Sequence, residues 1–180
     1  MTPAPGFGAV LAIDVGSVRI GLARCTDAEG VVIPLATLAN HAGVVDEVVG
    51  LIDQMPTGAV IIGLPLTLSG EVGPAAQTAQ LFADSLCRRV EPVPVYLVDE
   101  RLTTVEAQRR LSASGRSHRD SRRVIDQMAA AILLEHAVSV WRQTGNLPGI
   151  RVTLEQGPLP KPRKARHGKP AAVDPPSPGG

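Results

Sequence analysis

An uninterrupted apolar segment, residues 59–64, constrains the fold more than any other feature of this sequence. Its residues, Ala-Val-Ile-Ile-Gly-Leu, show no alternation of apolar and polar side chains, and Pro65 ends the segment. A strand with this pattern is covered on both faces, as parallel strands in α/β proteins are. The chain therefore needs a central sheet with helices on both sides.

The segments before this run indicate an antiparallel meander followed by a helix. Three predicted strands, joined by short turns that contain glycine, occupy residues 8–15, 19–25 and 31–36. Apolar side chains then recur at helical intervals over residues 41–54.

After the run, helices alternate with one more strand. Pro74 suits the first turn of a helix that continues to about residue 89, and a strand is expected over 93–98. Thr103 and Glu106 have the spacing of a capping box, which predicts a helix to about residue 115, and a last helix covers about 121–141. This order predicts an α/β domain with a mixed five-stranded sheet, three antiparallel strands and then parallel strands, flanked by helices.

Composition divides the chain into one domain and two ends. We expect a flexible N-terminus over 1–6, a folded domain over 7–150, and a disordered basic tail rich in Pro and Gly over 151–180. Residues 1–150 carry a net charge of −3, and the tail carries +4. Such a tail would add weak, salt-sensitive attraction to nucleic acid.

The sequence predicts a cytoplasmic protein that does not enter a membrane. It shows no basic signal-peptide region, and no apolar run approaches the ~18 residues needed to cross a bilayer. Cys25 and Cys87 lack metal-ligand spacing and are expected to be small buried side chains.

Three acidic residues, Asp14, Glu100 and Asp126, stand at or near the ends of predicted buried elements. Carboxylates there are poorly solvated and repel one another, so a divalent cation is the usual partner. Each has a plainer interpretation. Asp14 could form a turn before Gly16, and Asp126, which extends an apolar helix stripe, could favour a helix dipole or pair with an Arg.

Asp99 and Glu100 are adjacent, and strand alternation sends their side chains to opposite faces. Only one can face a site, and Arg101 could pair with the other. Glu100 is the first candidate and Asp99 the second.

A basic cluster follows these acids. Seven arginines lie between positions 101 and 123, namely 101, 109, 110, 116, 119, 122 and 123. The cluster indicates a polyanionic partner or, more plainly, a solvated helix face. The segment 63–65 and the hydroxyls of Thr103 and Thr104 would border the cleft, although Thr103 could serve only as a helix cap. Together with the three acids, this pattern fits phosphodiester hydrolysis with two Mg²⁺ or Mn²⁺ ions.

Four stretches resemble the YqgF family, also called RuvX. They are residues 12–23 (Ala-Ile-Asp-Val-Gly-Ser-Val-Arg-Ile-Gly-Leu-Ala), Gly63-Leu64-Pro65 with residues 70–77, residues 99–107 (Asp-Glu-Arg-Leu-Thr-Thr-Val-Glu-Ala) and residues 125–130 (Ile-Asp-Gln-Met-Ala-Ala). The resemblance spans roughly residues 8–140, and its Asp-Glu-Arg-Leu-Thr-Thr run is specific. Val18 departs from the Lys that is frequent there, and Gln127 from a small or apolar residue.

The resemblance implies a ribonuclease H-like fold and a bacterial nuclease described as acting on pre-16S rRNA or on Holliday junctions. It carries the family's acidic triad onto Asp14, Glu100 and Asp126. Nucleic-acid-binding positions fall on Arg19 and Arg101, with Thr103 and Thr104 beside them and Arg122 or Arg123 further along the chain.

The implied substrate is structured RNA, namely pre-16S rRNA or a ribosomal particle, and the protein would be a monomer or homodimer. Two alternatives stay open: a Holliday junction resolvase in DNA recombination, which needs two active sites in a symmetric dimer, and a non-catalytic nucleic-acid-binding adaptor. An actin-like kinase, which also begins with Asp-x-Gly, needs two large lobes and a longer chain.

Overall fold

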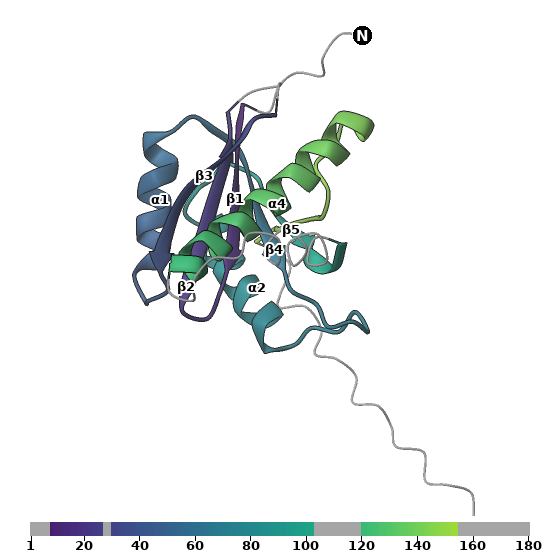
Figure 1. Ribbon diagram of the computed structural model, residues 1–180. Helices are drawn as coiled ribbons and strands as arrows, with labels where there is room; N and C mark the ends of the chain where they lie inside the picture. Colours follow the sequence, from purple (N-terminus) through teal and green to yellow (C-terminus); the bar gives the residue numbers. More distant parts are fainter. Residues whose placement is uncertain (1–7, 27–29, 103–119, 155–180) are drawn as a thin grey trace, which may run out of the picture.

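The computed structural model describes residues 8–26, 30–102 and 120–154. They form one mixed sheet with helices on both faces (Figure 1). The strands are β1 (Ala9–Val15), β2 (Arg19–Cys25), β3 (Val32–Ala39), β4 (Thr57–Leu64), β5 (Val95–Asp99) and β6 (Ile150–Arg151). The helices are α1 (Val44–Gln54), α2 (Pro74–Cys87) and α4 (Asp120–Thr144), and a 3₁₀ turn, η1, spans Glu100–Leu102.

The strand order is β3-β2-β1-β4-β5-β6. β1, β2 and β3 form the expected antiparallel meander, whereas β4 runs parallel to β1 and β5 parallel to β4. The predicted fold class is therefore confirmed. β4 lies third from one edge, which explains why its apolar run shows no alternation.

Side chains of alternate residues in each central strand point to opposite faces of the sheet and belong to two separate hydrophobic cores. On one face, Leu11 and Ile13 of β1 pack with Val48 of α1 and Ala83 of α2. On the other face, Ala12 of β1 and Ile61 of β4 pack with Leu133, Leu134 and Ala137 of α4. In Figure 1, α4 accordingly crosses one face of the sheet while α1 and α2 cover the other.

The sheet has six strands rather than the five expected. β6 adds two residues antiparallel to β5, after Gly149, whose φ of +96° favours glycine. A two-residue strand with an exposed Ile150 has no periodicity to reveal it. The expected boundary between domain and tail, at residue 151, thus falls inside a strand, and Val152 is buried beyond it.

Other expected segments lie outside the described residues. They are the N-terminal residues 1–6, the predicted helix at 103–115 and the tail from residue 155 onward. Within the described ranges, no helix combines the length and the apolar character required to cross a membrane.

Candidate active site

Asp14, Glu100 and Asp126 are carried by three different elements that meet on the α4 face of the sheet. Ala12 of β1 and Val98 of β5 belong to the core under α4. Asp14 follows Ala12 by two residues within β1, so strand alternation directs it to that same face, and Glu100, the first residue of the η1 turn after β5, hydrogen-bonds to it there. Asp126 lies in α4 itself. The site forms at the carboxyl ends of β1, β4 and β5.

Asp14 and Glu100 are linked by a side-chain hydrogen bond. Burial is the main cause that raises the pKa of Asp14 to about 6, with the negative charge of Asp126 adding to it. Burial also raises the pKa of Glu100 to about 8, followed by the charge of Asp14 and the shared hydrogen bond. At neutral pH, Glu100 therefore keeps a proton that it donates to the Asp14 carboxylate.

Asp126 has a cationic partner within the protein. Arg19, the first residue of β2, donates its Nε–H to Oδ2 of Asp126 across 2.7 Å. The two side chains are 29% and 22% exposed, so the ion pair is partly shielded from water. Arg19, predicted as a nucleic-acid contact, thus lies in the acidic cluster and neutralises one of its members.

Asp99 faces away from this pair and is bound to Arg101. The Arg101 side chain donates to both Asp99 carboxylate oxygens, from Nε to Oδ1 at 3.1 Å and to Oδ2 at 2.8 Å, and from Nη2 to Oδ2 at 2.6 Å; its backbone N–H also donates to Oδ1. The hydrogen bond from Arg101 is the main cause that lowers the pKa of Asp99. The plainer interpretation of Asp99, a surface ion pair, fits this arrangement.

Two glycines flank Asp14 on the neighbouring strands. Gly21 of β2 pairs with Asp14, and the register of Ile13 with Ile62 places Gly63 of β4 at its other side. A Cβ at Gly21 would overlap the backbone of Asp126, and one at Gly63 would overlap the Glu100 carboxylate. Neither role was predicted from the sequence, although a glycine inside a strand signals a close approach.

The donor set suits a hard divalent cation. Carboxylate oxygens are the ligands that Mg²⁺ prefers, and a cation would offset both the burial and the mutual repulsion that raise the pKa values of Asp14 and Glu100. In the part of the chain that the structure describes, no three His, Cys, Asp or Glu side chains are grouped as a ready-made metal site.

The remaining predicted site residues lie wholly or partly outside the described residues. Thr103 and Thr104 lie outside the described residues. The backbone of Arg122 and Arg123 lies in the first turns of α4, and their side chains are outside the description.

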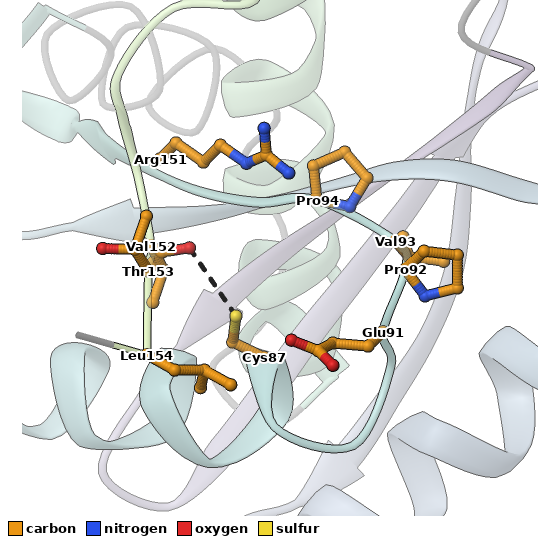
Figure 2. Close-up of a pocket in the computed structure, with 9 residues that line it drawn as sticks. All are labelled: Cys87, Glu91, Pro92, Val93, Pro94, Arg151, Val152, Thr153 and Leu154. Carbon is orange, nitrogen blue, oxygen red and sulfur yellow. Dashed lines mark hydrogen bonds between the residues drawn. The ribbon is translucent and has the colours of Figure 1, made fainter. Parts of the chain in front are cut away.

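A separate hollow of about 400 Å³ lies at the opposite end of β5 (Figure 2). It is lined by Cys87, Glu91, residues 92–94 and residues 151–154. The Cys87 thiol donates to the Val152 carbonyl at 3.6 Å, and burial is the main cause that raises its pKa. Both Cys87 and Cys25 are buried, as predicted, and neither forms a disulfide.

The strand order and the two helical layers define an α/β protein with a ribonuclease H-like fold, and its carboxylate cluster lies at the carboxyl ends of the central strands. Residues 8–139 match the family described as "RuvX: Holliday junction resolvase". The chain belongs to this family.

Its relatives cover most of the chain. A "Putative pre-16S rRNA nuclease" of Kineococcus radiotolerans is 45% identical over 89% of this chain and 84% of its own. A protein of the same description from Thermobifida fusca is 43% identical over 79% of this chain and 94% of its own length. Among solved structures, T. thermophilus RuvC in complex with Holliday junction substrate is 18% identical, covers 79% of this chain and 99% of its own, and has a TM-score of 0.48.

Proposed function

We propose that the protein is a metal-dependent endonuclease that hydrolyses phosphodiester bonds of structured nucleic acid and processes the 5′ end of pre-16S rRNA. The observation that carries this proposal is the buried, hydrogen-bonded Asp14–Glu100 pair, in which burial first, and the neighbouring negative charge second, raise the pKa values of both carboxyl groups. A site that stores this much electrostatic strain is suited to bind a cation. The similarity to relatives described as pre-16S rRNA nucleases supports RNA as the substrate.

Asp14, Glu100 and Asp126 would together hold two metal ions, either Mg²⁺ or Mn²⁺. When bound, such ions supply an activated water and stabilise the charge on the leaving oxygen. Glu100 must give up its proton to become a ligand, and Asp126 must share its carboxylate between Arg19 and the site.

Basic and hydroxyl side chains would hold the nucleic acid backbone. Arg19 and Arg101 border the acids, and Thr103, Thr104 and Arg122 or Arg123 complete the proposed surface. Arg101 is anchored by Asp99, whose carboxylate holds the guanidinium on the exposed surface at the end of β5. Such contacts position a substrate without reading its sequence.

The test is a cleavage assay on pre-16S rRNA and on a four-way DNA junction, with Mg²⁺ or Mn²⁺, using wild type and Asp14→Asn. We expect wild type to cut the RNA and Asp14→Asn to fall to background, because the variant loses a charged ligand but keeps its shape. A folded Asp14→Asn protein with full activity would refute the assignment.

A second candidate is junction resolution in DNA recombination, which the family's description as a Holliday junction resolvase favours. It predicts cutting of the DNA junction by a symmetric dimer, because two strands are cut at related positions. Sedimentation in the presence of junction tests it, and a strict monomer argues against it. Tight binding that is indifferent to Mg²⁺, without cleavage, would instead favour the non-catalytic adaptor.

A further inference from the structure

The Glu100 carboxylate lies over Gly63, in the space that any larger residue would fill. A Cβ built on Gly63 would overlap Oε1 of Glu100 and stand 2.7 Å from its Cδ and 3.1 Å from its Cγ. Gly63 is buried in β4, two residues after Ile61 of the α4-facing core. Its missing side chain therefore faces the acidic cluster.

Backbone conformation does not explain the glycine. Gly63 is not among the glycines with positive φ, so an alanine could adopt its backbone geometry without strain. The β4 neighbours Ile62 and Leu64 carry full side chains in the opposite core. What distinguishes position 63 is the carboxylate that stands against it.

The sheet register makes this space the place where two acids meet. Ile13 of β1 is level with Ile62 of β4, so Asp14 and Gly63 are next to each other across the parallel pair. Gly63 is level with Val98 of β5, two residues before Glu100. Glu100 can thus reach over Gly63 to the Asp14 carboxylate, with which it shares a hydrogen bond.

We infer that Gly63 is a positioning residue, whose lack of a side chain lets Glu100 lie against Asp14 and sets the separation of these two carboxylates for metal binding. The inference rests on the proposed function. The contact at Gly63 is with the end of a flexible side chain, so an alanine there would push the Glu100 carboxylate away while the strands stay in place.

The first experiment measures Mn²⁺ and Mg²⁺ binding to Gly63→Ala by calorimetry, together with thermal unfolding in EDTA. We expect a cooperative unfolding transition and metal affinity reduced about tenfold or more, as for other residues that orient ligands. Gly50→Ala is the matched control. Gly50 lies in α1 with open space around it, so its variant should bind metal like wild type.

A double-mutant cycle separates positioning from a general structural effect. Glu100→Asp shortens the side chain by one methylene and withdraws the carboxylate from position 63. We expect Gly63→Ala to weaken metal binding much less in the Glu100→Asp background than in wild type. An equal penalty in both backgrounds would overturn the inference.

The remaining outcomes are also decisive. A Gly63→Ala protein that binds metal like wild type, or that does not fold, overturns the inference. Either result shows that the alanine does not simply displace the Glu100 carboxylate while the strands stay in place. A wild type that binds neither metal overturns it as well. Metal binding that depends on Gly63, combined with no cleavage of RNA or DNA, would preserve the inference and refute only the nuclease.

Discussion

Asp14 and Glu100 are buried acids whose pKa values, about 6 and about 8, lie above those of carboxyl groups in an unfolded chain, near ~4. Between these limits the folded protein binds more protons than the unfolded chain. The free energy of unfolding must therefore fall as the pH rises from about 4 to about 8. In the absence of metal, ionisation of Asp14 and Glu100 therefore destabilises the folded protein above neutral pH.

Glu100→Gln should stabilise the metal-free protein at pH 8.5 by several kcal/mol, about 5 at most, because the pKa of Glu100 is raised from 4.5 to about 8, and it should leave the stability at pH 4.5 nearly unchanged. The amide keeps a donor for Asp14 but cannot ionise. Urea unfolding in EDTA at both pH values measures the effect, with Glu71→Gln in an exposed loop as control. A stabilisation of equal size at both pH values would contradict the electrostatic explanation.

Arg19→Gln should destabilise the protein in EDTA by about 2 kcal/mol. This value lies between the cost of breaking an ion pair on the surface and the cost of breaking a buried ion pair. The variant leaves Asp126, whose side chain is 22% exposed, without its guanidinium partner. Urea unfolding should show that Mg²⁺ restores more stability to this variant than to wild type, because a cation replaces the lost one.

Arg89→Gln is the matched control, since Arg89 pairs with Asp46 on the surface, where the side chains are 46% and 62% exposed. It should change stability by less than about 1 kcal/mol, with no added response to Mg²⁺. If the two variants behave alike, Arg19 has no special relation to the acidic cluster.

The acids themselves were visible in the sequence, whereas their partners were not. A carboxylate at the end of an apolar run stands out because burial of a charge is costly. Which of Asp99 and Glu100 faces the site depended on where β5 gives way to the η1 turn, and no local pattern specifies that residue. The Arg19–Asp126 pair joins residues 107 positions apart, so only the tertiary structure reveals it.

At the scale of elements, α4 approaches β2 closely because Gly21 has no side chain. A Cβ there would overlap the Asp126 carbonyl oxygen and stand 3.2 Å from the backbone nitrogen of Gln127. Backbone atoms cannot swing aside, so α4 itself would have to move. Gly21 and Gly63 thus have different roles. Gly21 allows the backbone of α4 to approach β2, and Gly63 leaves space for the Glu100 side chain.

Gly21→Ala should therefore cost about 1–3 kcal/mol of stability, as overpacking of a core does. Chemical denaturation measures the loss. Gly50→Ala should instead gain about 0.5–1 kcal/mol, because alanine favours a helix interior and nothing surrounds that position. A Gly21→Ala protein as stable as wild type would show that α4 can shift without penalty.

The elements were predictable where periodicity was strong. Continuous apolar runs identified β1 and β4, and the apolar stripe after Asp126 identified α4. Boundaries moved where hydrogen bonding rather than side chains decides them: β3 extends to Ala39, three residues beyond its expected end, because it keeps pairing with β2 as far as Arg19.

At the scale of the whole molecule, the fold is closed at one edge by residues just before the basic tail. β6 pairs with β5, the Val152 N–H donates to the Val95 carbonyl at 2.8 Å, and the buried Val152 side chain joins the core under α1 and α2. We propose that the folded domain extends to about residue 154 rather than to 150.

A chain that ends at Leu154 should consequently unfold at the same urea concentration as the full chain, whereas one that ends at Gly149 should lose about 2 kcal/mol, roughly the value of burying one valine. Denaturation of the three proteins tests this directly. Equal stability of the two shortened chains would show that β6 adds nothing. A large loss on ending at Leu154 would show that residues 155–180 take part in the fold, contrary to the disordered tail that their composition predicts.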